Sequence, residues 1–356
     1  MQATPTYDFL IVGQGLAGSL LGYFLEQAGK SCYFIDHPEQ TASTEVAAGI
    51  INPITGRYFV KSWRVDDLLP FAQRVYAGLE AELGHTFYHP RGLLRVLAHQ
   101  GDENDWLART GDPAYQPYMA ERADPGNYPE HTSPVYGYGE TKHSAQVDLP
   151  LLIKALRLRW QQQGRWTAAA FDHRLLEITP DGVRYPTLSA RNVVFCEGWR
   201  MRDNPFFSYL PLQGNKGQVL IVDFPGLVFN KMIKNKVFVA PLPDGTYWVG
   251  GTSENRFVDD APTPEGLAFL TEKLAELMRA PWVQLDHRSA VRPTVRDRRP
   301  LLGRHPQHRS LAVFNGLGTK GASLGPFWAW QMAIHLINDS PLDAEVDIAR
   351  FSPVAG

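Results

Sequence analysis

The chain has 356 residues, of which 44% are hydrophobic and 20% charged, and its formal net charge is −2. This length and composition are typical of a globular protein with one large domain or two domains of ordinary size. The nearly balanced charge gives no electrostatic reason to expect nucleic acid or an anionic membrane as a partner.

The cysteines, the histidines and the N-terminal region argue against several further classes of protein. Cys32 and Cys196 each lie in an apolar run typical of a buried strand, so we expect neither a disulfide nor a redox pair. Cysteines and histidines do not occur at metal-ligand spacings, so no metal site is expected. Glycines interrupt the apolar N-terminal stretch, which predicts strand, turn and helix rather than a signal peptide or membrane span. We expect a cytoplasmic location.

Residues 7–36 carry the pattern of a nucleotide-binding βαβ unit. The apolar run 9–12 predicts a buried parallel strand, and the sequence G-x-G-x-x-G follows it at Gly13. Apolar residues that recur every three or four positions then predict a helix ending at Gly29. A second strand-like run ends at Asp36. This context makes the motif a strong indicator of a dinucleotide site, although the motif does not distinguish FAD from NAD.

Each position of this motif has a physical role beside a pyrophosphate. Gly13 permits the tight turn, Gly15 lets backbone N–H groups approach the phosphates, and Gly18 lets the helix pack closely on the strand. The helix N-terminus adds partial positive charge and unpaired donors. Asp36 is placed to accept hydrogen bonds from the hydroxyls of an adenosine ribose. The predicted dinucleotide-binding residues of this unit are Gly13, Gly15, Leu16, Ala17, Gly18 and Asp36.

The segment Ala47-Ala48-Gly49 follows the ribose-binding strand and is made of small residues. Such a segment can lie along a flat cofactor where larger side chains would clash, and an ordinary surface loop is an equally good interpretation. A helical pattern follows over residues 65–83, with strand-like runs at 86–89 and 93–97. The three small residues are candidate cofactor contacts.

The second half of the chain changes character twice. The apolar run 190–198 predicts another parallel strand, which ends at Gly198, a further expected cofactor contact at the carboxyl edge of the sheet. Residues 217–253 alternate in polarity and predict an antiparallel sheet with a hairpin turn at 243–245. An amphipathic helix is predicted over 263–278, with Thr263 as its N-cap.

The C-terminal region predicts a return to the nucleotide-binding unit. Residues 311–314 form a buried strand pattern, 315–321 a second glycine-rich loop, and 325–337 a long apolar helix. Strand, loop and helix in this order repeat the arrangement at the N-terminus. We therefore expect one discontinuous domain built from both ends of the chain.

Together these motifs resemble the flavin-dependent D-amino acid oxidase, glycine oxidase and sarcosine oxidase family. The resemblance covers nearly the whole chain and rests on the N-terminal fingerprint, the Ala-Ala-Gly segment, VVFCEG, PLPDGTYWVGGTSE, VRPTVRDRRPLLG and NGLGTKGASLGP. It implies an α/β fold: a Rossmann-type FAD-binding domain with a doubly wound parallel sheet, and an inserted substrate domain built on an antiparallel sheet. The implied boundaries are 1–60, 145–205 and 288–356 for the FAD-binding domain, and 61–144 and 206–287 for the substrate-binding domain.

The resemblance favours FAD over NAD, because the C-terminal glycine loop completes the flavin site in such proteins. Backbone N–H groups of this loop and the following helix N-terminus can stabilise negative charge on a reduced flavin. No cysteine lies in the C-terminal loops, so the FAD is expected to be noncovalent. The implied flavin contacts are Gly316, Leu317, Gly318, Lys320 and Gly321.

The resemblance also implies residues that act on the substrate. Arg292 matches the family position that pairs with a substrate carboxylate, and a guanidinium can hold a carboxylate bidentately. A structural arginine bonded to backbone is the alternative. Lys320 lies where some relatives carry another anion-binding side chain, and it can face substrate, flavin or solvent. Tyr247 and Trp248 fall on the hairpin that lines the cavity in relatives, and we expect one of the two only to pack. The predicted catalytic residues are Arg292, Tyr247 and Lys320.

The implied reaction is oxidation of the C–N bond of an amino acid or secondary amine, which is a small-molecule substrate. A hydride passes to flavin N5 and water hydrolyses the imine, so neither a nucleophile nor a strong side-chain base is required. Oxygen or an electron carrier is the expected acceptor. Trp248 stands where certain oxidases have a lysine, so oxidase and dehydrogenase are equally open. The alternatives are another flavin reaction on this scaffold, such as an amine-oxidising step in modifying a larger molecule, a flavin-binding protein without turnover, and an NAD-dependent dehydrogenase.

Overall fold

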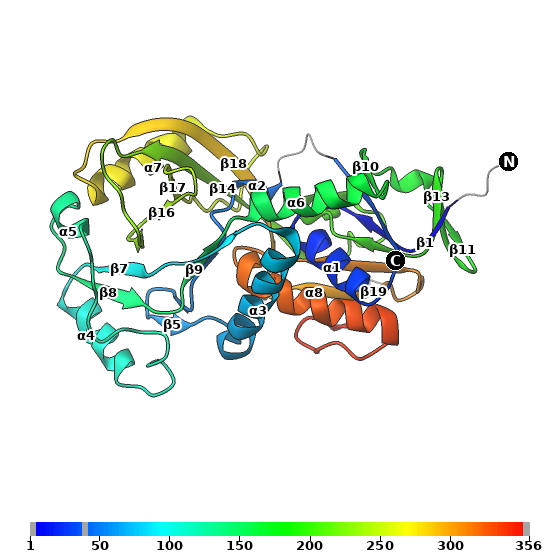
Figure 1. Ribbon diagram of the computed structural model, residues 1–356, viewed down its shortest axis with the longest axis horizontal. Coiled ribbons are helices and arrows are strands. Elements are labelled where there is room, and N and C mark those ends of the chain that lie inside the picture. Colours follow the sequence, from blue (N-terminus) through cyan, green and yellow to red (C-terminus); the bar gives the residue numbers. More distant parts are fainter. Residues whose placement is uncertain (1–4, 38–41, 352–356) are drawn as a thin grey trace. The chain divides into compact units, whose positions relative to one another are not determined.

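The computed structural model describes residues 5–37 and 42–351 (Figure 1). The chain divides into two compact units, each with its own hydrophobic core. Unit 1 comprises Met1–Glu45, Leu149–Asn215 and Val291–Gly356, and unit 2 comprises Val46–Asp148 and Lys216–Ala290. Residues 46–60, 145–148 and 288–290 therefore group with unit 2, whereas the family resemblance assigned them to the FAD-binding domain. Residues 206–215 group with unit 1, whereas the resemblance assigned them to the substrate-binding domain. The functional roles of the two units remain predictions.

Unit 1 contains an eight-stranded, mainly parallel sheet. Its central order is β10-β2-β1-β13-β12-β11, and β20 pairs with both β13 and β19. The pairs β10–β2, β2–β1, β1–β13 and β13–β20 are parallel, as the apolar strand patterns predict. The strands are β1 (Thr6–Val12), β2 (Cys32–Asp36), β10 (Trp166–Ala168), β11 (Glu177–Thr179), β12 (Gly182–Tyr185), β13 (Leu188–Phe195), β19 (Leu301–Arg304) and β20 (Leu311–Asn315).

Helices α1 (Leu16–Gln27), α6 (Leu149–Gln162) and α8 (Gly321–Asn338) also belong to unit 1. A Cβ at Gly321 would lie 3.1 Å from Leu16 Cδ2, and a Cβ at Gly325 would lie 2.9 Å from Leu20 Cδ1. The contacts run in the same direction along both helices, so α1 and α8 are parallel and begin side by side. Helix α8 starts at Gly321, four residues before the predicted start, because its glycine-rich first turns pack on α1.

Unit 2 is built around a seven-stranded sheet with the order β18-β14-β17-β16-β15-β7-β8. The pairs β14–β17, β17–β16, β16–β15 and β7–β8 are antiparallel, which confirms the antiparallel sheet predicted from residues 217–253. Leu242 N–H donates to Thr246 O across the predicted hairpin turn. The strands are β7 (Leu93–Leu97), β8 (Gly137–Thr141), β14 (Leu212–Asp223), β15 (Met232–Lys234), β16 (Phe238–Pro241), β17 (Tyr247–Gly250) and β18 (Val283–Val295).

The two faces of this sheet carry different clusters. One face, with Leu220, Val222 and Val249, packs with Leu270 and Leu274 of helix α7 (Pro264–Leu277). Thr263 Oγ1 accepts from Gly266 N–H at 3.2 Å, which confirms the predicted N-cap of α7. The opposite face carries the cluster of Val46, Ala48, Leu93, Val219, Ile221, Met232, Ala240, Trp248 and Ala290, here called the inner-face cluster.

The remaining elements of unit 2 are short, apart from one long helix. Helix α3 spans Val65–Leu83, as the sequence pattern predicts, and β6 begins at Tyr88 rather than Thr86. A three-stranded sheet pairs β3, β9 and β6, and a two-stranded sheet pairs β4 and β5. The elements are α4 (Gln100–Thr110), α5 (Tyr128–His131), β3 (Ile50–Ile51), β4 (Ile54–Thr55), β5 (Val60–Lys61), β6 (Tyr88–Pro90) and β9 (Ala145–Val147).

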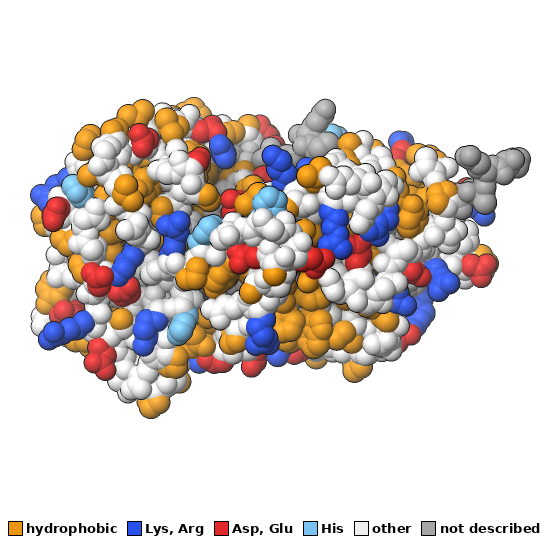
Figure 2. Space-filling model, in the orientation of Figure 1, with side chains coloured by type: hydrophobic (Ala, Val, Ile, Leu, Met, Phe, Trp, Pro, Cys, Tyr) orange, Lys and Arg blue, Asp and Glu red, His pale blue; other side chains and the backbone are white. Residues whose placement is uncertain are grey.

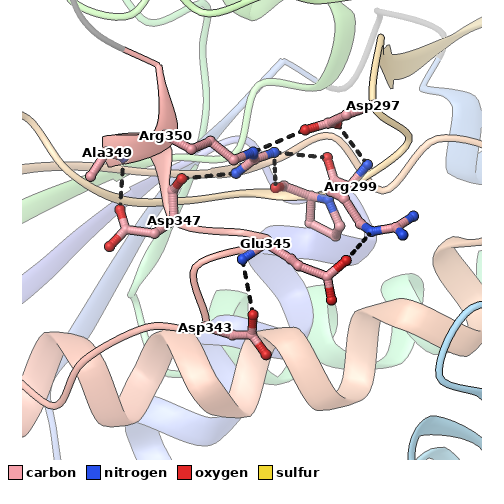
Figure 3. A network of polar contacts seen from close by, with 8 residues as sticks. Asp297, Arg299, Asp343, Glu345, Asp347, Ala349 and Arg350 are labelled. Carbon is pink, nitrogen blue, oxygen red and sulfur yellow. Dashed lines mark hydrogen bonds and ion pairs between the residues drawn. The ribbon is translucent and has the colours of Figure 1, made fainter.

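The loop between β18 and β19 is held by a polar network rather than left free in solvent (Figure 3). Arg350 donates from Nε to Asp297 Oδ2 at 2.9 Å and from an Nη to Pro300 O at 2.9 Å. Arg299 Nε donates to Glu345 Oε1 at 3.0 Å. Arg299 and Arg350 therefore have structural roles in this loop.

The face in Figure 2 carries basic and acidic side chains interspersed, in keeping with the small net charge. Within residues 5–37 and 42–351, no helix is both long enough and apolar enough to span a bilayer. The same ranges contain no group of three or more His, Cys, Asp or Glu side chains arranged to hold a metal ion.

Candidate active site

The predicted dinucleotide residues of unit 1 gather at one edge of its parallel sheet. Val12 pairs with both Ile35 and Phe195, and Phe195 pairs with Val313. The strands therefore end at the same level. The next residues along the four strands, which are Gly13, Asp36, Cys196 and Phe314, therefore all lie at this carboxyl edge. This edge is where open α/β sheets bind their ligands.

The three motif glycines differ in how much space the surrounding atoms leave for a side chain. Gly13 has a φ of 91°, and a Cβ there would lie 2.5 Å from Cys196 O. A Cβ at Gly18 would lie 2.0 Å from Gly13 O. Gly15 has an ordinary φ of −74°, and its nearest neighbour would be Thr44 Oγ1 at 3.4 Å. Packing alone thus explains Gly13 and Gly18, whereas Gly15 borders open space of the kind an approaching phosphate requires.

Two helix N-termini lie together at this edge. The N-cap of α1 is Gly15 and that of α8 is Lys320. Neither helix has a hydrogen bond from its N-terminal N–H groups to the side chain of its N-cap residue. Leu16 N–H donates to Thr44 Oγ1 at 3.3 Å. Because α1 and α8 are parallel and begin side by side, their positive dipole ends add at one place. This arrangement suits a diphosphate.

Asp36 is engaged by protein groups that the sequence analysis missed. Its Oδ1 accepts from Gln14 N–H at 3.0 Å, and its Oδ2 pairs with an Nη of Arg157 at 3.0 Å. Arg157 Nε donates to Gln14 Oε1 at 2.7 Å, and the guanidinium lies over the Trp166 ring. A carboxylate has about four acceptor positions, so Asp36 retains capacity for ribose hydroxyls. No local sequence signal pointed to Arg157, because its role depends on contacts across the fold.

The C-terminal glycine loop is fixed by backbone conformation and by Asn315. Gly316 and Gly318 have φ values of 76° and 57°, and Gly318 N–H donates to Pro293 O at 3.0 Å. Asn315 accepts from Gly316 N–H at 2.8 Å and donates to Gly198 O at 2.9 Å. This amide joins the loop to the glycine that ends the β13 segment, so Gly198 and the loop residues lie together.

Lys320 is partly buried at the start of α8. Burial lowers the pKa of its ammonium, and the neighbouring Arg298 and Arg299 guanidinium groups lower it further. Leu317 is buried, and a Cβ at Gly321 would touch Leu16. The loop therefore combines close backbone packing with local positive charge.

Arg292 lies on the C-terminal part of β18, which belongs to unit 1 from Val291 onward, and it is held by a neutral partner. Its Nη1 donates to Asn215 Oδ1 at 2.7 Å. Burial lowers the pKa of the guanidinium from its ordinary value. A partly buried guanidinium held by a neutral amide retains its charge and can bind a carboxylate.

Ala47, Ala48 and Gly49 belong to unit 2, where they are held by β9 and β17. Ala47 is exposed, whereas Ala48 is buried in the inner-face cluster. Gly49 has a φ of 63°, and a Cβ there would lie 1.9 Å from Val147 O. Gln146 Nε2 donates to Ala48 O at 3.3 Å, and the Trp248 indole N–H donates to Val46 O at 2.8 Å. The segment is thus an ordered structural element rather than a loose surface loop.

Tyr247 does not have the surroundings that its predicted catalytic role requires. Its side chain is 2% exposed within the cluster that packs on α7. Its hydroxyl accepts from Phe229 N–H at 2.9 Å and donates to Leu227 O at 3.4 Å. Both hydrogen-bonding functions are satisfied inside the core, so we correct its assignment to packing. Trp248 lies on the opposite, inner face of the sheet.

Both cysteines are buried free thiols, and burial raises the pKa of each. They are therefore neutral and poorly placed for nucleophilic or redox chemistry.

Comparisons with known proteins agree with this geometry. Residues 8–333 match the family model described as DAO, FAD dependent oxidoreductase. A glycine oxidase of Bacillus subtilis is 22% identical over 90% of each chain. A tRNA 5-methylaminomethyl-2-thiouridine biosynthesis bifunctional protein of Marinobacter nauticus is 25% identical over 92% of this chain and 55% of its own length. The chain spans about half the length of the first curated relatives that it matches.

A solved structure gives the same result for the fold. The crystal structure of glycine oxidase from Geobacillus kaustophilus superposes with a TM-score of 0.76 at 22% identity, and covers 99% of this chain and 100% of that chain. This likeness confirms the α/β architecture, with its parallel sheet and separate antiparallel sheet.

Proposed function

The chain belongs to the DAO family of FAD-dependent oxidoreductases, and on that premise we propose that it oxidises the C–N bond of a small amino acid or amine. The main support is the similarity to a glycine oxidase, which extends over 90% of both chains. The convergence of two glycine-rich segments and two helix N-termini at one sheet edge supports the cofactor part of the proposal.

We assign the residues of unit 1 to parts of the cofactor. Gly15 and the first turns of α1 and α8 would hold the pyrophosphate, and Asp36 would hold the adenosine ribose. The loop from Gly316 to Gly321 would hold the flavin end. When bound, FAD supplies the acceptor for a hydride and its two electrons. Ala47, Ala48 and Gly49 of unit 2 are further proposed contacts.

Arg292 is proposed to anchor the substrate carboxylate. Its neutral partner Asn215 orients the guanidinium without cancelling the charge. Lys320 and the N-terminus of α8 add positive potential at the C-terminal loop, which favours negative charge there. None of these residues needs to act as a nucleophile, because an amine lone pair can assist hydride departure and water can hydrolyse the resulting imine.

The remaining features of the proposal concern attachment, acceptor and location. The FAD is proposed to be noncovalent, since the only cysteines, Cys32 and Cys196, are buried in or beside strands. Oxygen or an electron carrier would reoxidise it. We propose a cytoplasmic location.

A second candidate is oxidation of an amine that belongs to a larger molecule. The observation that favours it is the 25% identity to a bifunctional protein of tRNA 5-methylaminomethyl-2-thiouridine biosynthesis. In this case a free amino acid would be a poor substrate, and the modified nucleoside would be a good one.

A product assay tests the proposal. The FAD-loaded protein is incubated with both enantiomers of amino acids and with N-alkyl glycines, either in air or with an artificial quinone. The expected result is a carbonyl product formed in equal amount to the released ammonia or amine. Turnover in air identifies an oxidase, and turnover only with the quinone identifies a dehydrogenase. No product from any amine with either acceptor contradicts the proposal.

A further inference from the structure

Two cations lie next to each other on the inner face of the unit 2 sheet. Arg95 of β7 and Lys234 of β15 are directly paired in a parallel register, and the pair Leu93–Met232 lies two residues along. Leu93 and Met232 both belong to the inner-face cluster. Because side chains alternate along a strand, Arg95 and Lys234 point to the same face as this cluster. That face also carries Ala48 and Trp248.

Aromatic rings surround these cations. The Lys234 ammonium lies 3.9 Å from the centroid of Phe238, which packs against the inner-face cluster. The Arg95 guanidinium lies 5.6 Å from the centroid of Phe59. Cation–π contacts hold each charge in place but do not neutralise it.

Neither cation forms an ion pair with a carboxylate of the described residues. The charge of Asp102 favours the protonated form of Arg95, but Asp102 Oδ2 accepts a hydrogen bond from Ala98 N–H at 2.9 Å. By contrast Lys231, the residue immediately before β15, pairs with Glu140 at 2.8 Å and with Asp124 at 3.2 Å. Unit 2 thus neutralises Lys231 and leaves the adjacent pair Arg95 and Lys234 with a net charge.

The two adjacent positive charges destabilise the folded protein when no anion is bound to it. Like charges on directly paired strand residues repel, and Arg95 and Lys234 are partly buried, where a lysine or arginine is normally matched by an acid. Burial lowers the pKa of Lys234 to about 8, and the Arg95 charge contributes to the same shift. Burial also lowers the pKa of Arg95. A bound anion would relieve both the repulsion and the desolvation.

We propose that Arg95 and Lys234 form a binding site for an oxyanion carried by the substrate, so that the preferred substrate is an amine or amino acid with an additional acidic group. A planar guanidinium beside an ammonium fits two oxygens of one carboxylate or phosphate. Ala48, which the sequence analysis predicted as a cofactor contact, lies in the cluster on the same face of the sheet, and this supports a substrate group rather than a separate ligand as the source of the oxyanion. This inference rests on the proposed function for the nature of the ligand.

The test is calorimetric binding to the FAD-loaded protein, with glutarate as the dicarboxylate probe and butyrate as the monocarboxylate of similar length. Wild type should bind glutarate at least about 10-fold more tightly than butyrate. Arg95→Gln and Lys234→Gln should each remove about 10-fold or more of the affinity for glutarate, the loss expected for a charge-assisted contact. Lys234→Arg keeps the charge and should retain most of the affinity.

Two exposed cations of the same unit serve as matched controls. Lys236→Gln and Arg256→Gln remove the same charges from exposed positions and should leave glutarate binding unchanged. Inorganic phosphate as a competitor identifies the oxyanion. Competition that requires both Arg95 and Lys234 indicates a phosphate-bearing substrate, and failure to compete indicates a carboxylate.

Equal affinity for glutarate and butyrate, or unchanged glutarate binding in both Gln variants, overturns the inference. Because binding is measured without turnover, the proposed function is tested separately. If a neutral amino acid reduces the flavin and glutarate affinity does not depend on Arg95 or Lys234, the proposed oxyanion site is wrong and the proposed reaction stands. Cation-dependent glutarate binding without flavin reduction by any amine keeps the site and removes the reaction.

Discussion

Substituting Gly15 by alanine separates cofactor binding from folding at the N-terminal motif. The added Cβ would lie 3.4 Å from Thr44 Oγ1, an ordinary contact, and the φ of −74° suits any residue. Alanine is a poorer N-cap than glycine, so we expect the free energy of unfolding of the FAD-free protein to fall by about 1 kcal/mol at most. The same methyl group would stand in the approach of the pyrophosphate. Loss of one charge-assisted hydrogen bond weakens FAD binding by about 1.5–3 kcal/mol, or about 10–150-fold.

Gly18→Ala is the contrasting variant. Its Cβ would lie 2.0 Å from Gly13 O, so the backbone must move, and the FAD-free protein should lose about 3 kcal/mol or more of unfolding free energy. The assays are chemical unfolding of both FAD-free variants and titration with FAD, followed by flavin fluorescence. A Gly15→Ala protein with wild-type affinity for FAD would refute the assignment of this glycine to the pyrophosphate.

Three further substitutions test individual residues. Arg292→Ala should raise the KM for a carboxylated substrate about 10–150-fold, and an unchanged KM would remove Arg292 from the site. Tyr247→Phe should lower the unfolding free energy by about 1–3 kcal/mol, because the Phe229 N–H loses its acceptor, and should leave kcat unaltered; a reduced kcat with unchanged stability would restore the catalytic assignment. Lys234→Met should raise the unfolding free energy at pH 7 by up to about 3 kcal/mol, because the pKa of the folded state is lowered from 10.5 to about 8. The destabilisation by Lys234 is complete below pH 8 and is relieved as the pH rises toward 10.5, so the difference in unfolding free energy should shrink over that range; equal stability at pH 7 would exclude an uncompensated charge.

Features governed by local chemistry were predictable from the sequence. The N-terminal strand, turn and helix follow from an apolar run, three glycines and a periodic pattern, and the structure has all three in this order. The N-cap Thr263 and the hairpin turn before Tyr247 were predictable for the same reason. In each case a few neighbouring residues determine the backbone conformation, so distant parts of the chain add little information.

Features that depend on packing across the chain were not predictable. Alternation places Tyr247 and Trp248 on opposite faces, but only the position of α7 determines which of the two faces is buried under it. The sequence at the start of α8 predicts a loop, because glycine disfavours helix. Contact of Gly321 and Gly325 with Leu16 and Leu20 of α1 stabilises the helix there instead.

The charged side chains of the two proposed binding sites were equally unpredictable from the sequence. Arg157 reaches Asp36 from a helix 121 residues away, and nothing in its local sequence distinguishes it from an exposed helical arginine. Arg95 and Lys234 become neighbours only through the parallel pairing of β7 with β15. Pairing between distant strands determines such contacts, and it has no short sequence signature.

The most direct test of the central claim is the visible absorption spectrum of the purified protein, recorded without oxygen before and after addition of amino acids and N-alkylated amines. The account predicts flavin bands that are lost on addition of at least one such compound and that return when an acceptor is admitted. Flavin bands that no amine bleaches would contradict the proposed C–N oxidation. A colourless protein that also fails to take up added FAD would contradict the assignment of the cofactor site itself.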